Sequence, residues 1–157
     1  MKRLFAVAVA LLLGACGGSS PETPVTCTPS GTWLTTITKG QASTSACAAI
    51  TLSPAETDLL NIPSSGQATY TSSTTSSTRG YAGTITAACV ANLAFSDTFN
   101  AGTDSAGTPI TASATDSREL TFNGSSVTGT GTITVSTSSA VVGFPCTLAY
   151  SLAGTRQ

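Results

Sequence analysis

Apolar side chains recur at every second position along most of this chain, and this alternation limits the folds that it can adopt. The alternate positions hold Trp33, Thr35 and Ile37 in one stretch, Tyr81 to Cys89 in another, and Cys146 to Leu152 in a third. A period of two places alternate side chains on opposite faces of a β-strand. Runs of this kind, separated by Gly, Asn, Pro and Ser, predict about eight strands. We therefore expect an all-β domain, either a single antiparallel meandering barrel or a sandwich, with at most one short helix.

One hairpin is predicted strongly. Asn123-Gly124 lies between two alternating runs, and this dipeptide favours a type I′ turn because both residues tolerate a positive φ. Gly129 and Gly131 follow on one face of the second run. Alternate glycines would permit a sharp bend of a barrel strand, or the close approach of a neighbouring strand.

Residues 53–61 hold the only helical signal that we recognise. Ser53 suits the N-cap, Pro54 suits the first turn, and Glu56 completes a capping box. We expect one or two helical turns here, with the carboxylates of Glu56 and Asp58 exposed to solvent.

The first fifteen residues have the order of a secretory signal. Met1-Lys2-Arg3 is basic, and residues 4–13 are an unbroken apolar run. This run is about half of the roughly 20 residues that a stable transmembrane helix needs. We therefore expect residues 1–15 to be a signal peptide that is removed on export.

The quartet Leu13-Gly14-Ala15-Cys16 resembles the lipobox of bacterial lipoproteins. The resemblance implies cleavage just before Cys16, a diacylglyceryl group on its sulfur, and an acylated amine. Two or three acyl chains anchor a protein stably to a membrane. Gly17 stands where the inner-membrane retention signal of enteric bacteria has Asp, so the resemblance implies the outer membrane, on either its periplasmic or its surface face. The alternative is an ordinary signal cut after Ala15, with Cys16 a free thiol.

After cleavage we expect a lipidated N-terminus and flexible tether at residues 16–29, followed by one β domain at residues 30–157. Loss of residues 1–15 removes Lys2 and Arg3, so the six basic residues fall to four against seven acidic ones, a net charge of −3. This balance excludes the clustered basic surface of a nucleic-acid-binding protein. The expected membrane contact is through the acyl chains alone.

Four cysteines remain in the exported chain, and an even number in an oxidising compartment predicts disulfides. They are Cys27, Cys47, Cys89 and Cys146. Of the three possible pairings we favour Cys27 with Cys47 and Cys89 with Cys146, because sequential closure is simplest for neighbouring strands. The chain has no His and its thiols are not closely spaced, so we expect no metal and no cofactor.

Gly31-Thr32-Trp33 opens the first predicted strand, and Arg156 follows the last one. Small lipocalin-like barrels begin with Gly-x-Trp and pack a basic residue over the indole, and both ends of this chain resemble them. The resemblance implies a barrel that holds a small apolar ligand, whereas the alternative interior is a filled core. The residues that would line the ligand site are Trp33, Ile37, Tyr81, Ile85, Phe95, Phe99, Val135, Leu148 and Tyr150.

We do not expect an enzyme. The chain has no His and no Gly-x-Ser-x-Gly, Lys39 lacks the companion motifs of Ser/Lys enzymes, and Asp116 and Glu119 are expected to be solvated acids beside a turn. Our first hypothesis is a lipid-anchored, non-catalytic structural or interaction module that contacts another envelope protein. The second is a carrier of a small apolar ligand. A filled core with an exposed apolar patch would favour the first, and an apolar cavity the second.

Overall fold

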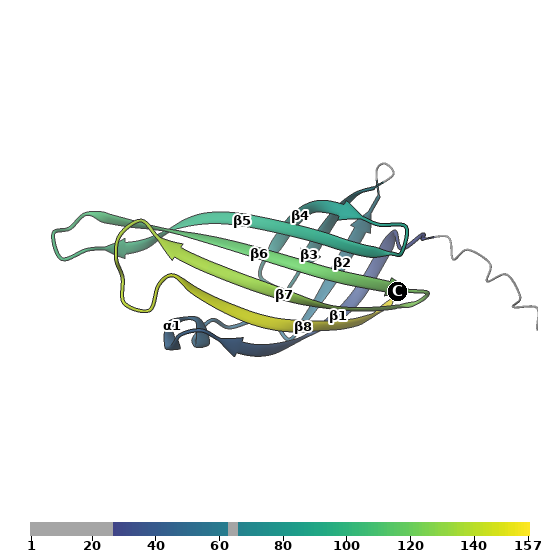
Figure 1. Ribbon diagram of the computed structural model, residues 1–157, viewed down its shortest axis with the longest axis horizontal. Coiled ribbons are helices and arrows are strands. Elements are labelled where there is room, and N and C mark those ends of the chain that lie inside the picture. The colour runs from purple at the N-terminus through teal and green to yellow at the C-terminus, as the bar shows by residue number, and fades with distance from the viewer. Residues whose placement is uncertain (1–26, 63–65) are drawn as a thin grey trace, which may run out of the picture.

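The protein folds as a closed antiparallel β-barrel in a computed structural model that describes residues 27–62 and 66–157 (Figure 1). Each strand pairs with the next in chain order, and the last pairs with the first. This confirms the all-β class and decides for a barrel over a sandwich. The elements are β1 (Gly31–Ala42), α1 (Ser45–Ala48), β2 (Ala55–Asn61), β3 (Gln67–Ser73), β4 (Thr78–Ile85), β5 (Val90–Thr103), β6 (Pro109–Asn123), β7 (Ser126–Thr137) and β8 (Cys146–Arg156).

The expected signal peptide (residues 1–15), the lipidation site at Cys16 and the tether as far as residue 26 lie outside the described residues. Residues 27–29, which we expected to belong to the tether, contact the barrel. Cys27 is disulfide-bonded to Cys89, and the carbonyl of Pro29 accepts a 2.9 Å hydrogen bond from Trp33 Nε1. Within the described part of the chain, no helix is long and apolar enough to cross a membrane.

The predicted alternation sets the two faces of the wall. Along β1 the side chains of Trp33, Thr35 and Ile37 are buried inside, whereas Leu34 and Thr36 lie outside. On β6 to β8 the outer positions are mostly Thr, Ser and Ala, so hydroxyl groups rather than charges make this wall soluble.

The prediction of a helix at residues 53–61 is wrong. Residues 55–61 form β2, in which Glu56, Asp58 and Leu60 are buried in alternation. Strand β2 gains backbone hydrogen bonds from β1 on one side and β3 on the other, and these pairings outweigh a local capping signal. The short helix α1 lies earlier, capped by Thr44, whose side chain accepts from the backbone N–H of Cys47.

The predicted hairpin is present, but its turn is shifted by one residue. Asn123 pairs with Ser126, so the two loop residues are Gly124 and Ser125. Only Gly124 has a positive φ, of 57°. Gly at the first loop position with a positive φ there alone is the pattern of a type II′ turn rather than type I′.

The two disulfides are present, but the pairing that we favoured is wrong. Cys27 pairs with Cys89, and Cys47 pairs with Cys146. Sequential closure fails because closing the barrel brings β1 beside β8, so the helix after β1 lies against the start of β8. The pairs therefore close loops of 62 and 99 residues.

Large apolar side chains fill the end of the barrel where the chain enters. The rings of Trp33 and Phe122 meet edge to face at 5.0 Å, and Leu60, Leu120 and Val127 are fully buried around them. The predicted contact at the two chain ends is present, with Arg156 Cζ 6.0 Å from the centre of the Trp33 ring. We call this end the closed end.

Candidate functional site

The other end of the barrel, which we call the open end, is incompletely walled. Strands β5, β6, β7, β8 and β1 have 11 to 15 residues, whereas β2, β3 and β4 have 7 or 8. The long strands therefore extend beyond the short ones and leave part of their inner face uncovered. Figure 1 shows the long β5–β6 hairpin and α1 together at this end, opposite the C-terminus.

The connection between β1 and β2, residues 43–54, lies over part of this inner face, and we call it the cover segment. The Cys47–Cys146 disulfide ties it to β8. Lys39 Nζ donates to the carbonyls of Ala48 and Ile50, the latter at 2.6 Å. Hydrogen bonds between Ser43 and Thr147 and between Ile37 and Pro54 attach its two ends to β8 and β1. The cover segment carries Ile50 and Leu52 to the edge of the opening.

Between the cover segment and β5 lies a cavity of about 320 Å³ with mainly apolar walls. This volume is at the small end of the range for small-molecule sites. Its residues are Ile50, Thr51, Leu52, Arg79, Phe95, Asp97, Phe99, Ala114, Asp116, Ile133 and Val135. The cavity is therefore an apolar trough whose wall also carries three charged side chains, those of Arg79, Asp97 and Asp116.

A second cavity of about 310 Å³ adjoins the first and leads toward the barrel axis. The two share five residues, among them Leu52, Arg79 and Asp116. The deeper lining adds Glu56, Arg118 and Tyr150. The site therefore changes from an apolar trough to a charged floor.

The charged floor is a buried network that we call the Arg118 cluster, formed by Arg118, Glu56, Asp116, Tyr81 and Tyr150. Arg118 Nη1 lies 2.9 Å from Glu56 Oε2, and Nη2 lies 3.5 Å from Asp116 Oδ2. Both phenols donate to Asp116, and Arg118 Nε donates to Tyr150 Oη at 2.9 Å. The guanidinium carbon lies 4.4 Å from the centre of the Tyr81 ring. These contacts satisfy charges that would be costly to bury alone.

Glycine makes room for this network. Gly131 faces Tyr150 across β7 and β8, and a Cβ at position 131 would lie 2.1 Å from Tyr150 Cζ. The predicted role of the alternate glycines, close approach of a neighbour, is confirmed. Gly131 leaves room for the phenol of Tyr150 to pass over β7 and donate to Asp116.

Protonation states in the Arg118 cluster follow from burial and charge. Burial alone would lower the pKa of Arg118, but the neighbouring phenols and the carboxylates of Glu56 and Asp116 raise it above its ordinary value. Burial raises the pKa of Tyr81 and Tyr150 well above that of a free phenol. Arg118 is therefore charged and both phenols are neutral donors at physiological pH.

A third buried carboxyl, that of Asp58, lies outside this network. Thr35 Oγ1 donates to Asp58 Oδ2 at 2.5 Å, whereas Asp58 Oδ1 and Tyr70 Oη have no hydrogen-bond partner among the described residues. Burial raises the pKa of Asp58 above its ordinary value, and the neighbouring hydroxyls only partly offset this. A proton on Oδ1 would provide a donor toward the nearby Tyr70 phenol.

We predicted that the acids at positions 56, 58 and 116 are exposed to solvent. This prediction is wrong, because all three side chains face the interior. On β6, Asp116 and Arg118 continue the inward register of Leu120 and Phe122. In the sequence, Asp116 and Arg118 occupy the same alternate positions as the apolar core residues that follow them. This pattern of two opposite charges at core positions could have revealed the network.

Only some of the nine predicted ligand residues line the cavities. Five of them line the cavities at the open end: Ile37, Phe95, Phe99, Val135 and Tyr150. Trp33 and Ile85 are buried toward the closed end, Leu148 is buried beside Ile133 in the wall nearer the open end, and Tyr81 belongs to the Arg118 cluster. Phe99 is 48% exposed because it lies on the part of β5 that extends beyond β4. Sequence reasoning missed Ile50, Leu52, Ala114 and Ile133.

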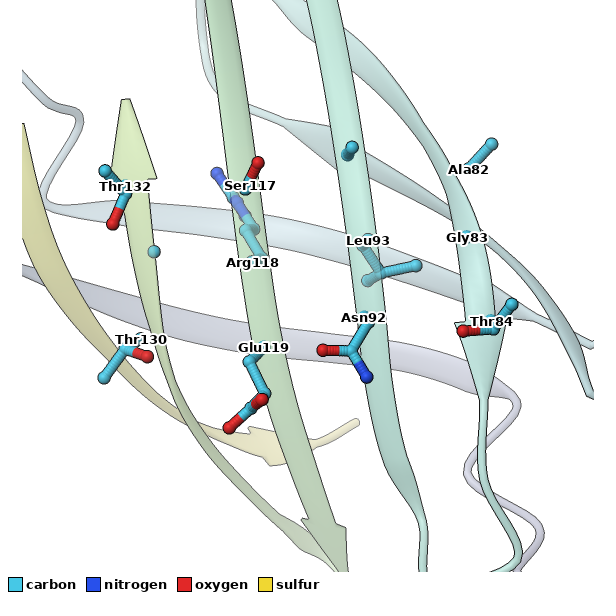
Figure 2. A pocket seen from close by; sticks show the side chains of 12 residues that line it. Ala82, Gly83, Thr84, Asn92, Leu93, Ser117, Arg118, Glu119, Thr130 and Thr132 are labelled. Carbon is cyan, nitrogen blue, oxygen red and sulfur yellow. The ribbon is translucent and has the colours of Figure 1, made fainter. Parts of the chain in front are cut away.

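A larger depression, of about 460 Å³, lies on the outer wall over β4, β5, β6 and β7. Figure 2 shows its short polar side chains, among them Asn92, Ser117, Thr130 and Thr132, on neighbouring strands. The depression is shallow and open to solvent, so it does not enclose a ligand. We therefore place the candidate site at the open end.

Comparison with known proteins finds no matching family model, no matching curated protein and no matching solved structure. The functional argument therefore rests on the geometry of this molecule.

Proposed function

We propose that this chain is a non-catalytic binding protein of the bacterial cell envelope, anchored to the outer membrane by acyl chains on Cys16. In this proposal the open end of the barrel holds a small amphiphilic molecule. The observation that carries the proposal is the apolar cavity of about 320 Å³ that continues into a charged floor. The apolar walls of the trough match an alkyl chain, and the charged side chains that line the same trough match a polar head.

The position of the open end supports an envelope carrier. The described chain begins at Cys27, which is tied to the closed end through Cys89. The cover segment and the tip of the β5–β6 hairpin lie at the opposite end (Figure 1). A lipid anchor before Cys27 would therefore leave the opening directed away from its own attachment point.

The interaction-module hypothesis is supported by a different feature. Leu34 and Leu59 are 46% and 52% exposed, and the pairing of Thr32 with Leu59 makes them diagonal neighbours on the outer wall. Two leucines make a small patch compared with the several hundred Å² that mark protein interfaces. The cavity is the stronger feature, so we place ligand binding first.

A fluorescence titration tests the proposed function. Residues 27–157 contain the closed barrel, its core and both disulfides, so a protein that starts at Gly17 keeps the folding unit and has no anchor lipid. The probe is N-phenylnaphthylamine, a neutral apolar dye that brightens on leaving water. We expect saturable binding. We expect Ala114→Trp, which places an indole in the trough, to weaken dye binding at least about tenfold.

The matched control is Ala153→Trp, an exposed position on the outer face of β8, which should leave dye affinity unchanged. A second variant, Leu52→Asp, places a charge in the trough wall and should weaken binding without filling the trough. A dye that fails to bind the parent protein, or that binds all four proteins equally, would contradict the proposed function.

A further inference from the structure

The open end has a gap in its wall between β4 and β5. The ladder between these strands pairs only residues 82–85 with residues 91–94. Arg79 and Asp97 each lie three residues beyond the last pair, Ala82 with Ala94, on opposite sides of the gap. Both line the trough, and both continue the inward register of their strands. The trough thus has a cation on one rim of the gap and an anion on the other.

Neither charge has an ion-pair partner among the described residues. In the part of the chain that the structure describes, both ion pairs belong to Arg118. The half-buried Arg79 guanidinium has no hydrogen bond to a described residue. Asp97 accepts one hydrogen bond, at 2.8 Å, from the backbone N–H of Thr98. An Arg beside an apolar trough without a counterion has unsatisfied capacity for a charge-assisted hydrogen bond.

The surrounding charges restrict what can bind there. Deeper in the site, one cation, Arg118, is shared between two acids, Glu56 and Asp116. A purely anionic head group at Arg79 would also face Asp97 and Asp116, which line the same cavity. A purely cationic head group at Asp97 would face Arg79. A head group that carries both charges opposes neither.

We propose that Arg79 and Asp97 form the head-group site for a single-chain zwitterionic amphiphile. The alkyl chain lies in the trough between the cover segment and Phe95. Arg79 donates to the oxyanion of the head group, and Asp97 faces its ammonium group. This inference rests on the proposed function, because it assigns the head group of a ligand whose chain occupies the same cavity.

Four amphiphiles with one dodecyl chain and different heads test the assignment by calorimetry, each below its micelle concentration. The heads are phosphocholine, which is zwitterionic, phosphate, trimethylammonium and neutral glucoside. We expect dodecylphosphocholine to bind most tightly. Arg79→Gln should weaken phosphocholine and phosphate binding by about tenfold, the scale of one charge-assisted hydrogen bond.

Asp97→Asn should weaken phosphocholine and trimethylammonium binding but strengthen phosphate binding, because it removes the opposing charge. Glu119→Gln, a change of an exposed acid on the outer wall, is the matched control and should change none of the four affinities. Neither of the two rim variants, Arg79→Gln and Asp97→Asn, should change the affinity for the glucoside.

The outcomes separate the two proposals. If glucoside binds as tightly as phosphocholine and the rim variants change nothing, the head-group inference is overturned while ligand binding stands. If phosphate binds more tightly than phosphocholine, the site is anionic-selective and the inference is equally overturned. If no dodecyl compound binds the parent protein, the proposed function itself fails.

Discussion

Buried charge is the feature that distinguishes this barrel at the scale of single residues. An eight-stranded barrel has an interior just wide enough for side chains to fill, and apolar residues would fill it most cheaply. Here Arg118, Glu56 and Asp116 occupy inward positions in its middle. The charges of the Arg118 cluster are satisfied within the cluster. Because the cluster lies between the filled core and the trough, it forms the floor of the site.

The stability of the protein should depend on the protonation of Asp58. Burial raises its pKa in the folded state above the unfolded value of about 3.9. The contribution of this group to stability is therefore fully present below about pH 4 and is lost as the pH rises through the folded-state pKa. Asp58→Asn removes this loss and keeps an acceptor for Thr35 and a donor toward Tyr70.

Urea unfolding of the parent protein and Asp58→Asn as a function of pH measures this effect. The free energy of unfolding of the variant should exceed that of the parent by an amount that grows above about pH 4 and then levels off. A difference that stays constant with pH would mean that Asp58 does not titrate abnormally.

Gly131 should not tolerate a methyl group. In Gly131→Ala the new Cβ would overlap the Tyr150 ring, which is held in place by the hydrogen bonds of its hydroxyl to Asp116 and Arg118. We expect a loss of about 1–3 kcal/mol in the free energy of unfolding, the usual cost of overpacking. Gly80→Ala is the matched control, because a Cβ there meets nothing within 4 Å. Equal melting temperatures for the two variants would show that the Tyr150 ring does not need the space above Gly131.

At the scale of elements, the sequence predicted strands well where apolar side chains alternate and poorly where charged ones do. Strand β1 and the β6–β7 hairpin follow the predicted alternation, but β2 was mistaken for a helix. Its inward residues include Glu56 and Asp58, and acids are normally outside. Only partners on β1, β3 and β6 make their burial possible, and such partners are not visible within one short segment.

The cover segment depends on the disulfide that joins α1 to β8. Replacing Cys47 and Cys146 by Ser should lower the free energy of unfolding by about 2–5 kcal/mol, because the bond closes a loop of 99 residues. It should also weaken dye binding, since the segment that carries Ile50 and Leu52 loses its covalent attachment to β8. Replacing Cys27 and Cys89 by Ser should destabilise the protein without changing dye affinity, because that bond lies at the closed end. If both double variants bind dye equally well, the cover segment is not a wall of the site.

At the scale of the whole molecule, unequal strand lengths divide the barrel into a filled end and a hollow end. The all-β class and the approximate number of strands could be predicted from the sequence. The division into a filled end and a hollow end could not. It depends on register. The last β4–β5 pair toward the open end is Ala82 with Ala94, after which β5 continues for nine residues; the last β1–β2 pair is Thr36 with Ala55, after which β1 continues to Ala42. Register also explains why the nine predicted ligand residues, chosen for character alone, divided between the core and the cavity.

The most direct test of the account is where an alkyl chain contacts the protein. Dodecylphosphocholine below its micelle concentration is added to protein with labelled Ile, Leu and Val methyl groups, and intermolecular NOEs from the alkyl chain are recorded by NMR. The account predicts contacts to Ile50, Leu52, Ile133 and Val135 at the open end. Contacts confined to Leu34 and Leu59 on the outer wall, or no contacts at all, would contradict it.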